Sequence, residues 1–173
     1  MVTVPAACDH PPVPSTVTIR TAAVADVAAL REVYRRSSLS NEGDRDLLSA
    51  HPELLEWSDL AVREGRTRMA EADGCVAGFA TVMFTETAAE LEDLFVDPDW
   101  MRRGIGRALV EDIAVVARSA GSPFIEVDAN PHALSFYSRV GFVSVGEADV
   151  PYGTGTRMRR ATNSPDRRGE RGR

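Results

Sequence analysis

The sequence predicts an α/β (α+β) fold, in which four helices flank a mixed, mostly antiparallel sheet of about seven strands. Three observations support this prediction. The dipeptide Asp73-Gly74 joins two strand-like segments and is typical of a β-hairpin. Segment 90–109 reads as a strand ended by Pro98, a glycine-rich loop and a helix. A helix that joins this strand to the next one makes the two strands parallel.

The first half of the chain is expected to supply a short strand, two helical regions and three antiparallel strands. A helix begins near Ala23, because apolar residues recur at helical spacing from Val24 to Tyr34. A second helical region is broken at Pro52, which cannot continue a helix, and ends near Gly65. The expected strands are 17–20, 67–71, 75–85 and 89–96, and the expected helices are 23–37, 45–50 and 52–64, with a polar loop at 38–44.

The second half is expected to supply a helix, a strand, another helix and a final hairpin. The first helix starts at Ile105 and is capped by Gly121. The second helix has Asn130 as its N-cap, Pro131 at its first position and Gly141 just past its end. The expected strands are 124–128, 142–147 and 156–160, and the second helix spans 131–140.

Length and composition indicate one globular domain. The chain has 173 residues, of which 43% are hydrophobic. We expect the domain at 17–160, a disordered proline-rich arm at 1–16 and a disordered basic tail at 161–173. No apolar run approaches the roughly 20 residues of a membrane span, and the N-terminus lacks the features of a secretory signal. We therefore expect no membrane partner and a cytoplasmic location.

The charge distribution bears on the class of partner. The formal net charge is −6, and the segment from Arg157 to Arg173 carries seven Arg against two acidic residues. That segment is therefore +5, and the rest of the chain is −11. An acidic body argues against a nucleic-acid-binding surface and is compatible with a cationic acceptor.

The glycine-rich loop is suited to bind a phosphate or a diphosphate. Gly104 and Gly106 stand at the start of a helix, where the first amides have no partner within the helix and the helix dipole is positive. Arg102, Arg103 and Arg107 add positive charge there. The dinucleotide fingerprint needs three glycines, and the nucleoside-triphosphate loop needs a Lys, which this chain lacks. Taken alone, the two glycines are also compatible with a simple helix cap.

Two motifs resemble those of the GNAT superfamily, the acyl-CoA-dependent N-acyltransferases. Segment 90–109 resembles motif A, with the core pattern Gln/Arg-x-x-Gly-x-Gly/Ala, which Gly104 and Gly106 match. Met101 stands where that pattern has Gln or Arg. Segment 130–142 resembles motif B, Asn-x-x-Ala-x-x-Phe/Leu-Tyr-x-x-x-Gly-Phe, at every fixed position.

The resemblance implies a GNAT fold whose sheet is split between the fourth and fifth strands, with acetyl-CoA in the split. In this family the backbone of the fourth strand pairs with the pantetheine arm, and one amide polarises the thioester carbonyl. The residues that match the cofactor site are Leu94, Phe95, Val96, Arg102, Arg103, Gly104, Ile105, Gly106, Arg107 and Asn130. An N-capping role is sufficient by itself to explain Asn130.

The resemblance also implies catalytic residues. Tyr137 matches the general acid of the family, although its helical spacing also suits a core aromatic residue. Glu90, Glu92 and Glu126 are candidates for the base; a water chain is the alternative, and each carboxylate would also suit a solvated strand surface. The three histidines show no metal-ligand spacing, so no metal is expected.

Three functions remain open from the sequence. The first is an N-acetyltransferase that moves an acetyl group from acetyl-CoA to a primary amine by direct attack in a ternary complex. Its acceptor would be a small molecule or a protein N-terminus. The second is a non-catalytic acyl-CoA-binding or regulatory module on the same fold, and the third is a nucleotide-binding protein. Dimerisation is left open.

Overall fold

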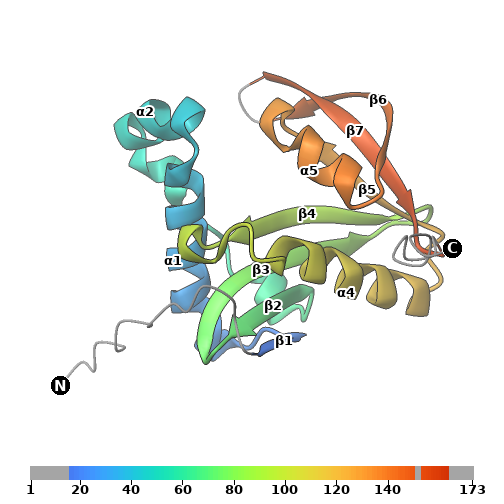
Figure 1. Ribbon diagram of the computed structural model, residues 1–173, viewed down its shortest axis with the longest axis horizontal. Helices are drawn as coiled ribbons and strands as arrows, with labels where there is room; N and C mark the ends of the chain where they lie inside the picture. The colour runs from blue at the N-terminus through green and yellow to red at the C-terminus, as the bar shows by residue number, and fades with distance from the viewer. Residues whose placement is uncertain (1–15, 151–152, 164–173) are drawn as a thin grey trace, which may run out of the picture. The chain divides into compact units, whose positions relative to one another are not determined.

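A computed structural model describes residues 16–150 and 153–163. In these ranges, seven strands form a mixed sheet with the order β1-β2-β3-β4-β5-β7-β6 (Figure 1). The strands are β1 (Val17–Thr21), β2 (Thr67–Ala72), β3 (Cys75–Phe84), β4 (Ala89–Val96), β5 (Phe124–Ala129), β6 (Val143–Val150) and β7 (Gly153–Ala161). The α-helices are α1 (Val27–Ser40), α2 (Glu42–Ala50), α3 (Leu60–Arg63), α4 (Ile105–Ser119) and α5 (Leu134–Arg139). The predicted α/β class is thus confirmed.

Contacts between residues divide the chain into two compact units. The first unit comprises the chain up to Thr81 together with Asp93–Leu109. The second comprises Val82–Glu92 and the chain from Val110 onward. Residues 1–15 of the predicted arm at 1–16, and most of the predicted tail at 161–173, lie outside the described residues.

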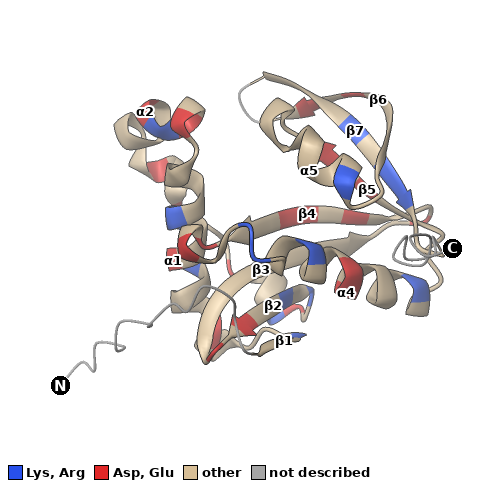
Figure 2. Ribbon diagram, in the orientation of Figure 1, with Lys and Arg blue, Asp and Glu red and all other residues tan. Residues whose placement is uncertain are grey.

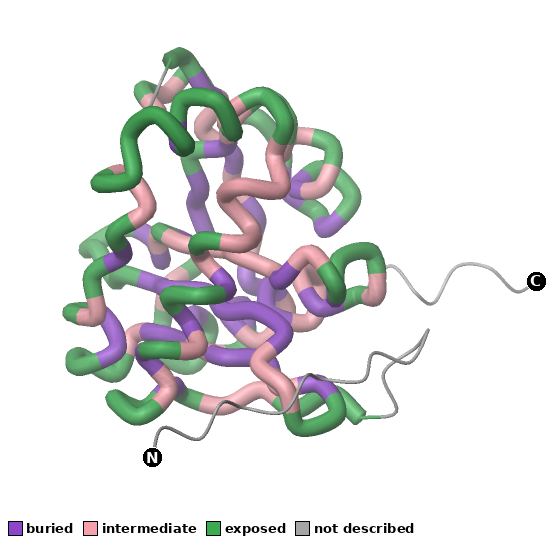
Figure 3. Tube along the Cα trace, turned by 90° about the vertical axis from the view of Figure 1, so that its left-hand side faces the viewer, coloured by how far each residue is buried: buried purple, intermediate pink, exposed green. Residues whose placement is uncertain are grey.

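The first unit is built on an antiparallel sheet with a buried aromatic core. Between β2 and β3, Asp73 and Gly74 have φ values of 49° and 82°, the left-handed pair of a tight hairpin turn, as predicted. Helix α1 buries Leu30 and Val33 in this core, where they join Phe79 of β3. The buried residues are purple in Figure 3.

Helix α1 ends three residues later than predicted. It extends to Ser40, and α2 begins at Glu42, so the polar loop expected at 38–44 is wrong. Asn41 explains the difference, because its side chain accepts a hydrogen bond from the Gly43 amide and caps α2. A one-turn 3-10 helix, η1 (Val24–Asp26), precedes α1 where one continuous helix was expected.

The second unit contains the parallel pair of strands. Residues Ala89 and Glu90 of β4 lie opposite Ile125 and Glu126 of β5, as the crossover predicted. Before β4, the Thr85 hydroxyl closes the turn that follows β3: it accepts a hydrogen bond from the Ala88 amide and donates one to the Ala88 carbonyl.

The final hairpin is longer than the ranges 142–147 and 156–160 predicted, because β6 and β7 pair from Val143↔Arg159 to Val150↔Gly153. A register shift between Ser144 and Gly146 lies within the pairing. An added Cβ at Gly155 would lie 2.7 Å from the Ala129 carbonyl, so glycine permits β7 to approach β5 closely.

Helix α5 begins and ends near the predicted positions, but its cap differs. It is preceded by the 3-10 turn η4 (Pro131–Ala133), with Pro131 in the first turn. Asn130 is the N-cap by position, yet its side chain makes no capping hydrogen bond, which corrects the prediction. Gly141 follows the helix with a φ of 94°. No helix in the described ranges has the length and hydropathy needed to cross a membrane.

Candidate active site

The glycine-rich loop of the first unit leads directly into α4. Gly104 has a φ of 84°, and its carbonyl accepts a hydrogen bond from the Ala108 amide at 2.9 Å. The amides of Ile105, Gly106 and Arg107 therefore lie in the first turn, where intrahelical partners are lacking. An added Cβ at Gly104 would meet no atom within 4 Å, so backbone conformation, not space, requires glycine there.

The three predicted arginines of this turn lie in different environments. Figure 2 shows Lys and Arg positions in blue on the loop before α4 and at the start of that helix. Arg102 is exposed and has a positive φ of 60°, which is uncommon for a residue with a side chain. The guanidinium of Arg103 lies 5.2 Å from the ring centroid of buried Trp100, a cation–π contact. Arg107 is half-buried in the first turn of α4. An anion at this turn would meet positive charge and amide donors together.

The turn before the loop is fixed to β3 and to α1. The Asp97 amide donates to the Ala77 carbonyl at 2.9 Å, and the Asp97 carboxylate accepts from the Asp99 amide at 3.0 Å. Arg36 of α1 binds the Asp99 carboxylate at 2.7 Å and lies 3.4 Å from that of Asp97. This ion-pair network positions the segment that enters the glycine-rich loop.

The predicted pantetheine-binding residues Leu94, Phe95 and Val96 are the last three of β4, and all are half-buried. The Phe95 ring packs on Tyr34, with centroids 4.8 Å apart, and on Phe79 at 5.6 Å. Gly78 of β3 makes room for this segment, since an added Cβ would lie 2.7 Å from the Phe95 carbonyl oxygen. The C-terminal end of β4 is thereby packed against α1 and β3.

In the second unit, a cavity of about 270 Å³ lies where the β4–β5 pairing stops. The described pairing of these strands comprises two residue pairs, of which Glu90↔Glu126 is the second. All three predicted candidates for the base line this cavity. Its charged lining residues are Glu90, Glu92, Glu126, Asp128, Asp149 and Arg157.

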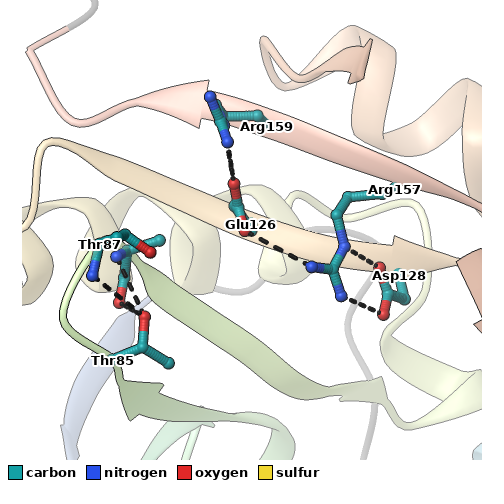
Figure 4. A network of polar contacts seen from close by, with 7 residues as sticks. Thr85, Thr87, Glu126, Asp128, Arg157 and Arg159 are labelled. Carbon is teal, nitrogen blue, oxygen red and sulfur yellow. Dashed lines mark hydrogen bonds and ion pairs between the residues drawn. The ribbon is translucent and has the colours of Figure 1, made fainter. Parts of the chain in front are cut away.

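Two arginines of β7 hold two of these carboxylates (Figure 4). Glu126 is buried, with 8% exposure, and accepts a hydrogen bond from the Arg159 Nε at 2.7 Å. Arg157 donates from Nε and Nη2 to the two carboxylate oxygens of Asp128, both at 2.8 Å, and its Nη1 lies 3.9 Å from Glu126. The Arg157 guanidinium lowers the pKa of Asp128 below its usual value, and Asp128 raises that of Arg157.

Tyr137 is buried in α5, with its ring against those of Phe136 at 5.2 Å and Phe142 at 5.3 Å between centroids. The core packing that its helical spacing indicated is therefore present. Asn130 is half-buried before the same helix.

The sequence prediction missed Asp128, Asp149 and Arg157. Asp128 could have been found, since it lies two residues after Glu126 on a strand and thus on the same face. The other two depend on how β6 and β7 pair with β5, and that register includes an irregularity that no local pattern indicates. Within the described residues, no group of three or more His, Cys, Asp and Glu side chains is placed to hold a metal ion.

Comparison with known proteins places the chain in a family. A model of the acetyltransferase (GNAT) family matches residues 27–142, about two thirds of the chain. The chain belongs to the GNAT family. This GNAT protein is therefore an acetyl-CoA-dependent N-acetyltransferase.

Three relatives show how far this similarity extends. A glucosamine 6-phosphate N-acetyltransferase of Trypanosoma brucei brucei is 30% identical over 100 residues, covering 52% of this chain and 68% of that enzyme. A streptothricin acetyltransferase of Streptomyces lavendulae is 40% identical over 43% of this chain and 42% of its own length. A ribosomal protein bS18-alanine N-acetyltransferase of Escherichia coli (strain K12) is 36% identical over 40% and 49%. This GNAT chain thus spans less than half the length of the latter two relatives.

Solved structures show the same fold. A PaiA N-acetyltransferase from Thermoplasma acidophilum, in complex with coenzyme A, gives a TM-score of 0.66 at 20% identity and covers 84% of this chain and 99% of that one. A GCN5-related N-acetyltransferase from Rhodopseudomonas palustris gives 0.68 at 22% identity, with 86% and 98% covered. The fold predicted from the two GNAT motifs is confirmed.

Proposed function

We propose that this GNAT protein acetylates a primary amine that attacks acetyl-CoA directly in a ternary complex, with no covalent enzyme intermediate. The observation that carries the proposal is the carboxylate-lined cavity where the β4–β5 pairing stops after Glu90 and Glu126. An amine acceptor is a cation until it loses a proton, so a cavity with carboxylates suits both its binding and its deprotonation.

Acetyl-CoA supplies the activated acetyl group, and the glycine-rich loop would hold its diphosphate. The amides of Ile105, Gly106 and Arg107 offer hydrogen-bond donors at the positive end of α4, and Arg102 is exposed beside them. Leu94, Phe95 and Val96 would pair with the pantetheine arm through their backbone, and Asn130 would contact that arm or the loop.

Glu90 is the best candidate for the base among the three predicted carboxylates. It is half-buried, lines the cavity and makes no hydrogen bond to another described residue. Glu126 accepts a hydrogen bond from Arg159 and lies near Arg157, so its oxygens are engaged by permanent cations. We therefore propose that Glu126 holds the guanidinium groups of Arg159 and Arg157 in place beside the cavity. Glu92 is exposed, and we place it at the rim of the cavity.

The reaction then follows with its protons balanced. Glu90 takes a proton from the acceptor ammonium, directly or through water, and the neutral nitrogen attacks the thioester carbonyl. The C–N bond forms, the attacking nitrogen then loses its second proton to solvent, the C–S bond breaks, and the Tyr137 phenol donates its proton to the departing thiolate. Solvent returns a proton to Tyr137, and Glu90 releases its proton. The acceptor is a small amine or a protein N-terminus.

Thiol release from acetyl-CoA, measured over a panel of amines, tests the proposal. Glu90→Gln and Tyr137→Phe should each lower kcat by about 100-fold or more, because each removes a proton-transfer group. Glu86→Gln changes an exposed carboxylate outside the cavity and should leave kcat unchanged. Unchanged rates in Glu90→Gln or Tyr137→Phe would remove that residue from the mechanism.

A second candidate function rests on Met101. This residue is 38% exposed and stands where motif A has Gln or Arg, so one donor to the diphosphate is lacking. A non-catalytic acyl-CoA-binding or regulatory module would tolerate that loss. Saturable CoA binding without thiol release for any amine would select this function.

A further inference from the structure

The cavity of the second unit carries an excess of negative charge. Its lining includes five carboxylates and the guanidinium of Arg157. Arg159 adds a second guanidinium through its ion pair with Glu126. These seven side chains carry five negative and two positive formal charges.

The sheet geometry concentrates this charge. Glu90 and Glu126 are directly opposite each other on parallel strands, about 4.8 Å apart, so their side chains leave the same face. Like charges opposite each other on a sheet are destabilising unless cations offset them. Arg159 offsets Glu126 and Arg157 offsets Asp128, whereas Glu90 and Asp149 make no hydrogen bond to another described residue.

The amine that is acetylated does not neutralise the negative charge of the cavity throughout the reaction. It must be neutral when it attacks, and its proton then resides on the base. During the reaction the cavity therefore gains no lasting cation from the nitrogen that is acetylated. A second ammonium on the acceptor would remain charged throughout and would pair with a carboxylate that the arginines leave available.

We propose that the acceptor of this protein is a small diamine, whose distal ammonium is bound by Asp149 while the other amine is acetylated. This proposal rests on the proposed function. Asp149 is exposed and lies near the end of β6, opposite Thr154, so it stands at the rim of the cavity. The volume of about 270 Å³ is slightly below the range of pockets for drug-sized ligands, which suits a short, linear molecule.

The same charge distribution disfavours anionic acceptors. A phosphate or carboxylate on the acceptor would enter a cavity lined by more carboxylates than guanidinium groups, and like charges at close range cost several kcal/mol. A sugar phosphate, the substrate class in the name of the Trypanosoma relative, is therefore a poor acceptor for this cavity.

Three acceptors of equal chain length test the proposal. Thiol release with saturating acetyl-CoA is measured for 1,4-diaminobutane, n-butylamine and 4-aminobutanoate, whose distal groups are positive, neutral and negative. We expect kcat/KM to fall by about tenfold or more from the diamine to the monoamine, and further to the amino acid. Asp149→Asn should lower kcat/KM for the diamine about tenfold and that for n-butylamine much less, and Glu86→Gln should change neither.

Binding is measured as well, so that the diamine proposal and the acetyltransferase proposal can fail separately. Equal kcat/KM for the three acceptors, or an Asp149→Asn effect of the same size on n-butylamine, overturns the diamine proposal and leaves amine acetylation standing. Absence of thiol release with every amine contradicts the proposed function. In that case, calorimetry of 1,4-diaminobutane with the wild type and Asp149→Asn decides the binding claim, and equal or absent heat overturns it.

Discussion

At the scale of single residues, the partners of a carboxylate decide what it can do. Glu126 and Asp128 each face a guanidinium group at hydrogen-bond distance, so the oxygens of both carboxylates are engaged by arginine. The Arg157 guanidinium also lowers the pKa of Asp128. Glu90 occupies the same face of the sheet without such a partner among the described residues. The sequence grouped Glu90, Glu92 and Glu126 as equivalent candidates, because strand alternation shows which face a side chain occupies and not which arginine lies next to it.

Asp26 of the first unit offers a test of an ion pair away from the candidate active site. Its carboxylate accepts hydrogen bonds from Arg20 at 2.8 and 2.9 Å and from the Ala23 amide at 2.8 Å, and Arg20 holds the pKa of Asp26 below its usual value. A carboxyl whose pKa is lowered by folding stabilises the protein above its unfolded pKa of 3.8, and this stability is lost as the pH falls through the folded value.

Asp26→Asn should therefore lower the free energy of unfolding by about 1 kcal/mol at pH 7, or about 2–4 °C in Tm, since the pair is partly exposed. The difference from the wild type should shrink as the pH falls below 3.8. Urea unfolding at several pH values measures it. Asp46→Asn, at an exposed position of α2, is the control, and a pH-independent difference in Asp26→Asn would contradict the assigned cause.

At the scale of elements, the turn before the glycine-rich loop should matter for binding more than for folding. Arg36→Gln removes the ion pairs to Asp97 and Asp99 that fix this turn to α1. We expect the KM for acetyl-CoA to rise about three- to tenfold with kcat nearly unchanged, because a loosened loop must be ordered on binding. The matched control is Arg35→Gln, whose arginine pairs with Glu32 one turn earlier on the same helix. Equal effects of the two substitutions would show that the turn is not positioned by Arg36.

The ion pair between a buried arginine of β7 and a glutamate of α4 provides a second test at the scale of elements. Arg160 of β7 is 6% exposed, and its Nη2 donates to both carboxylate oxygens of Glu111 on α4 at 3.0 and 2.8 Å. Its Nε and Nη1 have no hydrogen-bond partner among the described residues. Removing the counterion would leave a buried charge uncompensated, which is more costly than removing both partners.

Glu111→Gln should accordingly destabilise the protein by about 1–3 kcal/mol in urea unfolding, with Glu147→Gln, at an exposed position of β6, as the control. The double variant Glu111→Gln with Arg160→Met should regain part of this loss, since it removes the buried charge as well. A double variant less stable than Glu111→Gln would contradict this reasoning.

The elements that the sequence predicted well are those determined locally. The Asp73-Gly74 hairpin, the end of β4 before Pro98 and the start of α4 at Ile105 depend on residues within a few positions. The ends of β6 and β7 were predicted too short, because their length is set by pairing with each other across the hairpin. Asp149 and Arg157 reach the cavity through that pairing, so the acceptor side of the site could not be predicted from the chain alone.

At the scale of the whole molecule, family membership establishes the reaction class and leaves the use of each residue to experiment. The GNAT family model matches residues 27–142, and the solved structures share the fold. We propose more specifically that the glycine-rich turn at Gly104 and Gly106 binds the diphosphate of coenzyme A at the start of α4. It follows that ligands with the diphosphate should bind far more tightly than ligands without it.

Isothermal titration of CoA, dephospho-CoA and pantetheine into the full chain measures this directly. Dephospho-CoA keeps the diphosphate, and pantetheine keeps the thiol arm without it. We predict one-to-one binding of CoA, a Kd for dephospho-CoA within a few-fold of that value, and binding of pantetheine at least about 100-fold weaker. Equal affinities for CoA and pantetheine, or no heat with CoA, would contradict the claim.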